Sequence, residues 1–205
     1  ALLNPNVHYH EVHVPEYPLF HYQPYELALS SKLVDMVKLY KIDVLHVHYA
    51  IPHAYAGYMA KQMLADEGIH IPMVTTLHGT DITLVGNHPF YKPAVSFSIN
   101  KSDVVTSVSQ SLKDDTYRLF DITNEIEVIP NFIELNKEKL KENIPCHRSL
   151  MAPDNEKIIT HISNFRKVKR IEDIVRIFYE IQQEVPSKLM MVGEGPEKDG
   201  AEQLC

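Results

Sequence analysis

The stretch TTLHGTDIT combines several residue types that could do chemistry at one place. An apolar run ends at Leu77, and His78, Gly79, Thr80 and Asp81 follow in a row. Such a run is typical of a buried strand, and open α/β sheets bind ligands beyond the carboxyl ends of their parallel strands. A turn that caps a following helix would account for Thr80 and Asp81 but leaves His78 unexplained. Two interpretations stand: a capped turn with His78 satisfied by a backbone carbonyl, and a binding site.

The basic stretch SNFRKVKR is a second candidate. Arg166, Lys167, Lys169 and Arg170 lie between an expected strand and an expected helix. Cations at the amino end of a helix oppose its dipole, which favours anions there. A bound phosphate would relieve this repulsion, because backbone N–H groups favour phosphate at such an end and Arg and Lys add charge-assisted hydrogen bonds. The stretch therefore indicates a phosphate site, with a solvated basic loop as the alternative.

Two further stretches place small or polar residues after expected strands. HVHYAIPHA puts Tyr49 and His53 in a loop on the ligand side, although these residues could also only cap a helix that starts at Ala54. VGEGPE puts Gly193 and Gly195 in a turn whose backbone could approach a nucleotide. A lone Gly-x-Gly is weak evidence by itself.

Short apolar strands that alternate with helices predict parallel sheets covered on both faces, in a doubly wound α/β fold. Strands are expected at 7–14, 43–47, 72–77, 103–109 and 126–129, with helices at 25–40, 54–66, 91–101 and 110–120. A polar stretch at 133–150 then acts as a connector with one short helix, and the rhythm restarts with a strand at 157–162, a helix at 171–184 and a strand at 188–192. The strands from 43 to 130 should be parallel in one sheet, and the last two in a second.

Composition excludes several classes of function. The 205 residues carry a net charge of −7, which gives no general reason to bind nucleic acid or acidic membranes. No apolar run approaches the ~18 residues of a membrane-spanning helix. The two cysteines, Cys146 and Cys205, form no CxxC pair, so a reducing cytoplasm is expected. The 12 histidines include no HExxH motif, and no metal is expected.

Taken together, these stretches resemble the retaining GT-B glycosyltransferases of family 4. HGTD, VIPNFI at 128–133, FRKVKR and VGEGPE occur in that family's order. The resemblance implies two Rossmann-like, doubly wound parallel-sheet domains, both incomplete here: an acceptor-side domain at 1–132, a connector at 133–153 and the start of a nucleotide-sugar domain at 154–205. The family's first strand, its glycine-rich loop and its distal Glu-x7-Glu segment are not in this sequence, so these residues alone are expected to be inactive.

The closer resemblance is to the branch that transfers N-acetylglucosamine from UDP-GlcNAc to L-malate in bacillithiol synthesis. It is carried by LHVHYAIPHA, VTTLHGTDIT, SDVVTSVSQSL and HISNFRKVKR. On the donor side it implies that Arg166 and Lys169 hold the diphosphate and act in catalysis, that Asn164 lines the donor pocket, and that Gly193 and Gly195 border the donor.

For the acceptor side, the resemblance implies that His78 lies near the sugar ring as a catalytic residue. Tyr49 and Thr76 match positions that hold the malate acceptor. The family's bacillus-type members have an arginine where this chain has Ser96. A carboxylate would then need another cation, and Lys92 and Lys101 are the candidates.

The implied chemistry is front-face glycosyl transfer, in which the departing phosphate takes the proton of the acceptor hydroxyl. Arg166 and Lys169 would stabilise the growing charge on UDP, so neither a metal ion nor a cofactor is needed. The expected partners are a UDP-sugar and a small acceptor, L-malate, with no nucleic acid and no membrane span, and a homo-oligomer is left open. Three alternatives are a related transferase with a sugar or lipid acceptor, a non-catalytic nucleotide-sugar-binding module and an unrelated phosphate-binding α/β protein.

Overall fold

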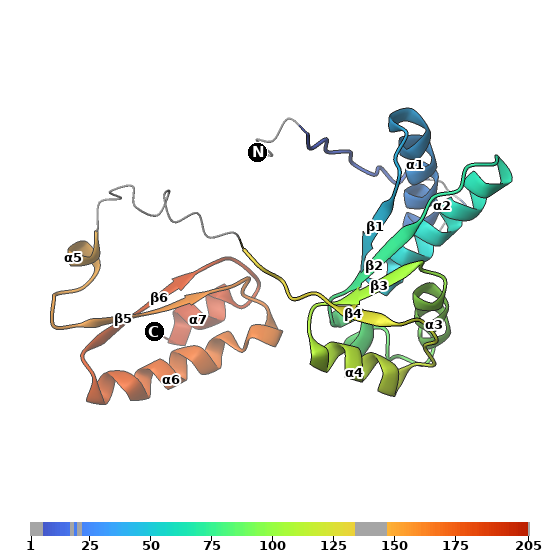
Figure 1. Cartoon of the computed structure of the whole chain (residues 1–205). Helices are drawn as coiled ribbons and strands as arrows, with labels where there is room; N and C mark the ends of the chain where they lie inside the picture. The colour runs from blue at the N-terminus through green and yellow to red at the C-terminus, as the bar shows by residue number, and fades with distance from the viewer. Residues whose placement is uncertain (1–5, 17–18, 20–21, 134–146, 205) are drawn as a thin grey trace. The chain divides into compact units, whose positions relative to one another are not determined.

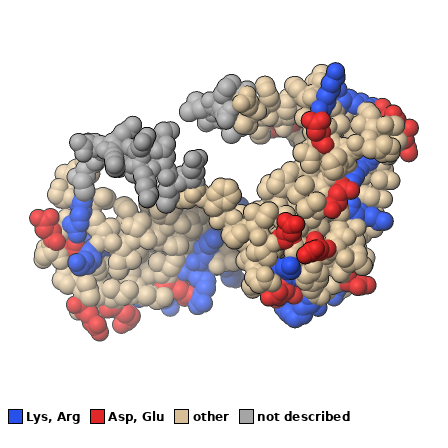
Figure 2. All heavy atoms as spheres, viewed as in Figure 1, with Lys and Arg blue, Asp and Glu red and all other residues tan. Residues whose placement is uncertain are grey.

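The computed structural model describes residues 6–16, 19, 22–133 and 147–204. The chain divides into two compact units, Ala1–Glu134 and Leu135–Cys205 (Figure 1). On the face shown in Figure 2, acidic and basic side chains are interspersed on both units, so the net negative charge forms no single patch there.

A four-stranded parallel sheet forms the centre of the first unit. Its strands are β1 (Leu45–His48), β2 (Met73–Leu77), β3 (Val104–Ser107) and β4 (Ile126–Val128), in the order β1-β2-β3-β4. Leu45 pairs with Met73, Val74 with Val104, and Val105 with Ile126. The predicted parallel arrangement of these strands is therefore confirmed.

Four helices connect or precede these strands. They are α1 (Tyr25–Tyr40), α2 (Tyr55–Asp66), α3 (Lys92–Asn100) and α4 (Gln110–Leu119). A polar residue marks the start of α4, where the Ser109 hydroxyl accepts a hydrogen bond from the Leu112 N–H at 3.2 Å. Single wide turns, Ala50–Ala54 and Thr80–Leu84, follow β1 and β2 and were not predicted.

The sheet buries one face under helices and presents a polar second face. Leu45 and Val47 of β1 are buried with residues of α1 and α2, whereas His46 and His48, which alternate with them along the strand, are exposed. Within the described residues the strand order follows the chain without a reversal, so the expected helices on the second face are not seen there.

The predicted strand at 7–14 is wrong, because none of the described strands lies there. The segment is largely exposed, and the rings of His8 and His10 lie 6.1 and 5.1 Å from that of Tyr40, at the end of α1. Loose alternation of apolar and polar residues is compatible with any extended segment. A strand also needs a neighbouring strand to which its backbone can bond. Among the described strands, β1 pairs only with β2, so the segment 7–14 does not pair with β1.

The second unit has the parallel strands β5 (Lys157–Ile162) and β6 (Ser187–Val192), as predicted. The helix α6 (Ile171–Glu184) connects them, and α7 (Lys198–Leu204), which was not predicted, follows β6. Phe165, Ile171, Val175 and Ala201 form the core. Most of the predicted connector, 133–153, lies outside the described residues, and α5 (Arg148–Met151) is the helix seen in the rest of it. None of the described helices is long and apolar enough to cross a membrane.

Candidate active-site loops

His78 and Tyr49 meet at the carboxyl edge of the first sheet. They are the first residues after β2 and β1, which are neighbours, so both follow strand ends on the same edge. The rings of Tyr49 and His78 have centroids 4.9 Å apart. The Nδ1 atom of His48 lies 2.7 Å from the Nε2 atom of His78. The structure thus brings together two residues that the sequence assigned to separate roles.

The surroundings of the His48–His78 pair lower the pKa of both imidazoles. Burial lowers the pKa of His48, and the charges of His46 and His53 lower it further. Burial also lowers the pKa of His78, His48 adds to this effect, and Asp81 opposes it. A hydrogen bond between two imidazoles needs one N–H and one lone pair, which a doubly protonated pair cannot supply.

Thr76 faces a small groove on the polar side of the sheet. Its Oγ1 atom lies 2.8 Å from Nε2 of His46 and 2.7 Å from Oγ1 of Thr106, so one hydrogen-bonded row crosses β1, β2 and β3. The groove has a volume of about 260 Å³, and its lining includes His46, His48, Thr106 and Asn131. Drug-sized ligands occupy ~300–1,000 Å³, so this groove suits a small molecule.

The structure does not join the two candidate lysines to these acceptor residues. The Nζ atom of Lys92 lies 5.7 Å from the centre of the Phe120 ring, and that of Lys101 lies 6.0 Å from the centre of the Phe97 ring. Lys101 directly follows α3 and precedes β3, which places it at the amino edge of the sheet, away from Tyr49. No hydrogen bond or ion pair among the described residues links either lysine to Tyr49 or Thr76.

His48, His46 and Asp81 are residues of this region to which sequence reasoning gave no role in a site. One of the two interpretations had Thr80 or Asp81 cap a turn, but the Thr80–Leu84 turn has no side-chain cap, and Asp81 is buried. Its signal in the sequence was the position of an acid just beyond a buried strand. The partners of that acid come from another loop, which no local pattern reveals.

The basic loop of the second unit leaves β5 and enters α6. Asn164, Arg166, Lys167 and Lys169 are exposed, whereas Phe165 between them is buried and anchors the loop in the core. None of the ion pairs among the described residues involves Arg166, Lys167 or Lys169. Arg170 differs, because its Nε atom lies 2.5 Å from the Asp173 carboxylate. The loop therefore presents three unpaired cations next to the amino end of α6, where an anion is favoured.

The glycine turn after β6 holds this basic loop in place. The N–H of Phe165 donates to the Glu194 carbonyl at 2.8 Å, and the N–H of Glu197 donates to the Phe165 carbonyl at 3.0 Å. Gly193 and Gly195 have φ angles of 149° and 155°. A Cβ at Gly193 would lie 1.8 Å from the Ser163 carbonyl oxygen, so the missing side chain is needed for this close approach. The predicted approach of the same glycines to a nucleotide stays a prediction.

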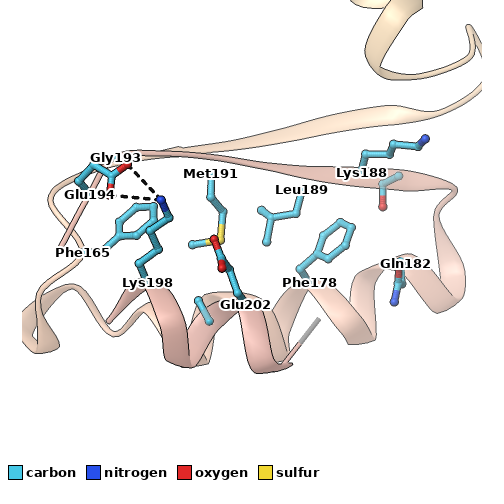
Figure 3. A pocket seen from close by; sticks show the side chains of 12 residues that line it. Phe165, Phe178, Gln182, Lys188, Leu189, Met191, Gly193, Glu194, Lys198 and Glu202 are labelled. Carbon is cyan, nitrogen blue, oxygen red and sulfur yellow. Dashed lines mark hydrogen bonds and ion pairs between the residues drawn. The ribbon is translucent and has the colours of Figure 1, made fainter. Parts of the chain in front are cut away.

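A groove of about 680 Å³ borders the glycine turn, and Phe165, Gly193 and Glu194 are part of its lining (Figure 3). Apolar side chains of β6 and α6 line it, among them Leu189, Met191 and Phe178. At its end, the Nζ atom of Lys198 lies 3.1 and 3.3 Å from the two carboxylate oxygens of Glu194, which raises the pKa of Lys198. Lys198 is therefore neutralised locally and adds no free charge to the basic loop.

No three His, Cys, Asp or Glu side chains among the described residues are arranged to hold a metal ion. The side chains of these loops offer hydroxyls, imidazoles, a buried carboxylate and unpaired cations. Cations suit the binding of a phosphate group, and hydroxyls and imidazoles suit hydrogen bonds to a small polar molecule.

Known proteins resemble this chain in sequence and in fold. It is 46% identical over 193 residues to N-acetyl-alpha-D-glucosaminyl L-malate synthase of Bacillus anthracis, covering 94% of this chain and 50% of that protein. It is 28% identical over 186 residues to an uncharacterised glycosyltransferase of Methanocaldococcus jannaschii, covering 85% of this chain and 46% of that protein. The chain thus spans about half the length of the curated relatives it matches.

Among solved structures, HepE of Anabaena in complex with UDP and glucose matches with a TM-score of 0.58 and 16% identity, over 85% of this chain and 46% of HepE. This likeness and the parallel sheets confirm the predicted GT-B class of fold. Residues 2–137, more than half of the chain, match the family described as Glycosyltransferase Family 4. On this match and the identity to its curated relatives, the chain belongs to glycosyltransferase family 4.

Proposed function

We propose that the full-length protein is a retaining glycosyltransferase that moves N-acetylglucosamine from UDP-GlcNAc to L-malate. The observation that carries this proposal is the 46% identity to the Bacillus anthracis enzyme of that name, which extends over 94% of the chain and so over both units. The geometry of the two sets of loops supports it independently.

Unpaired cations support a UDP-sugar as the donor. Arg166 and Lys169 are exposed at the amino end of α6 without an acidic partner among the described residues. In the proposed reaction the bond from the sugar C1 to the phosphate oxygen breaks, the bond to the acceptor oxygen forms on the same face, and the phosphate takes the hydroxyl proton. Negative charge on UDP increases along this path, so fixed cations stabilise the transition state more than the bound donor.

Polar side chains support a small acceptor at the first unit. Tyr49 and His78 meet at the edge of the sheet, and Thr76 faces the adjacent groove. Hydroxyls and imidazoles can donate hydrogen bonds to a carboxylate. We place the malate acceptor here, with His78 next to the sugar ring.

One observation favours a second candidate, a neutral sugar acceptor. Among the described residues, no lysine or arginine lines the groove beside Thr76, and Lys92 and Lys101 lie over aromatic rings. A dicarboxylate is bound most strongly where a cation pairs with it, whereas a sugar needs only hydrogen bonds.

Product analysis separates these candidates. The full-length protein is incubated with UDP-GlcNAc and either L-malate or a panel of neutral sugars, and products are identified by mass spectrometry and by the anomeric proton in NMR. We expect an α-linked N-acetylglucosaminyl malate. Transfer to a sugar with none to malate would overturn the malate assignment. Binding of UDP-GlcNAc without transfer to any acceptor would favour a non-catalytic binding module.

A further inference from the structure

Asp81 is a buried carboxylate that joins the two loops of the carboxyl edge. Its side chain is 3% exposed. One oxygen, Oδ2, accepts a hydrogen bond from the Ala50 N–H at 2.8 Å, and Ala50 belongs to the loop after β1. The other, Oδ1, accepts from the N–H groups of Gly79 at 3.0 Å and His78 at 3.3 Å, in its own loop after β2. Three backbone donors thus converge on one acid.

The loop that Asp81 holds contains a strained residue. Tyr49 has a φ of 78°, a conformation that residues with a Cβ rarely adopt. Such a conformation persists only when its surroundings determine it. The Tyr49 N–H donates to the Thr76 carbonyl at 2.9 Å, and the next N–H, that of Ala50, donates to Asp81. Without Asp81, one of these two fixed points is lost and Tyr49 can relax.

The strained geometry has a consequence at the site, because it brings the Tyr49 ring to 4.9 Å from the His78 ring. His78 itself is bound to Asp81 through its backbone N–H. One carboxylate therefore sets both the position of Tyr49 and the start of the His78 loop.

We propose that Asp81 is a positioning residue that fixes Tyr49 and His78 relative to each other by accepting backbone hydrogen bonds from both loops. This inference rests on the proposed function, in which Tyr49 contacts the acceptor and His78 the sugar. Asp81 does not touch either substrate in this role. It acts only through the backbone of the residues that do.

Asp103 offers a matched control at the opposite edge of the same sheet. Its Oδ2 atom accepts a hydrogen bond from the Met73 N–H at 2.6 Å, at the start of β2, and it pairs with Lys61. Both acids thus hold backbone N–H groups at an end of β2. Only Asp81 holds the two loops that carry Tyr49 and His78.

The test compares Asp81→Asn and Asp103→Asn in the full-length protein. For Asp81→Asn we expect kcat/KM for the acceptor to fall about tenfold to a hundredfold, because an amide cannot accept all three bonds. Affinity for UDP, which lacks the sugar, should stay within twofold. Asp103→Asn should change kcat/KM for the acceptor and the affinity for UDP by no more than about twofold, even if it lowers the melting temperature. Equal losses in Asp81→Asn and Asp103→Asn, or unchanged acceptor kinetics in folded Asp81→Asn, would overturn the proposal.

A second measurement does not depend on the acceptor. Asp81 raises the pKa of His78 against burial and His48, so in Asp81→Asn the NMR titration of His78 should shift to lower pH. The Ala50 amide should also exchange faster with solvent. If the wild-type protein makes no malate product, the proposed function fails, while the exchange rate of the Ala50 amide still decides the role of Asp81. Unchanged Ala50 exchange in folded Asp81→Asn would refute the positioning role by itself.

Discussion

Three cations of one short loop differ in what we expect them to do. Arg166, Lys167 and Lys169 are all exposed and without an acidic partner among the described residues. The family resemblance assigns the diphosphate to Arg166 and Lys169 only. In the full-length enzyme, Arg166→Ala and Lys169→Ala should each lower kcat by a few hundredfold, or ~3–4 kcal/mol, and weaken donor binding much less.

Lys167→Ala is the control for this prediction, because it removes the same charge from the same turn. Steady-state kinetics on the three variants decide between the roles. If Lys167→Ala caused the largest loss of kcat, or if Arg166→Ala changed only KM, the assignment of the diphosphate ligands would be wrong.

The paired histidines predict a pH dependence of stability. The folded-state pKa values of His48 and His78 lie below the ordinary value of 6.5, so the unfolded chain binds more protons as the pH falls below that value. Stability is therefore fully present above pH 6.5 and is lost as the pH falls through the folded-state pKa values. We expect the melting temperature to drop between pH 7.5 and 5.0, and to drop less in His48→Gln.

Replacement of His70 serves as the control, because His70 lies in the loop before β2 and is not part of the His48–His78 pair. His70→Gln leaves the His48–His78 pair intact. Its melting temperature should therefore fall between pH 7.5 and pH 5.0 by as much as that of the wild-type protein. If the melting temperature of His48→Gln fell between pH 7.5 and pH 5.0 as far as that of the wild-type protein, the histidine pair would not contribute to the pH dependence of stability.

Among the elements, the glycine turn after β6 makes a specific demand on sequence. Gly193 and Gly68 both have positive φ, but a Cβ would lie 1.8 Å from the Ser163 oxygen at Gly193 and would meet nothing within 4 Å at Gly68. Gly68→Ala should cost only the backbone strain, roughly 1–2 kcal/mol. Gly193→Ala should cost more than about 3 kcal/mol, because the backbone must also move.

Hydrogen exchange of the β5 and β6 amides measures directly how much stability the second unit loses in Gly193→Ala. Because this turn holds the basic loop through Phe165, Gly193→Ala should weaken UDP binding as well. Normal UDP affinity in a folded Gly193→Ala protein would show that the basic loop does not depend on the turn.

At the scale of all 205 residues, the net charge of −7 should oppose the proposed anionic donor, whereas the basic loop should attract it. Salt screens charges over about 8–10 Å at 0.1–0.15 M, so the near cations should outweigh the distant acids. Raising the salt from 50 to 500 mM should then weaken UDP binding severalfold, as calorimetry can measure. Arg166→Ala should show a smaller dependence, and tighter binding at high salt would mean that the overall charge dominates.

The sequence determined the elements with strong local patterns. Helices α1 and α6 and strand β5 have the bounds that the sequence predicted. The buried residues of the two helices recur at helical spacing, as Val34 and Val37 do in α1 and Ile171 and Val175 do in α6. It also placed His78 and Tyr49 beyond strand ends and the basic loop before α6. Parallel pairing followed from the alternation of strands and helices, since a parallel pair requires a crossover.

Only the tertiary structure decided which of these residues meet. The bonds from His48 to His78 and from Asp81 to Ala50 join residues 30 and 31 positions apart, which no local spacing encodes. The same holds for the segment 7–14, which pairs with none of the described strands, and for Lys101, which the direction of α3 carries to the far edge of the sheet. Propensity acts within a few residues, whereas contacts across a sheet depend on how separate elements pack, and that packing is fixed only when the whole unit folds.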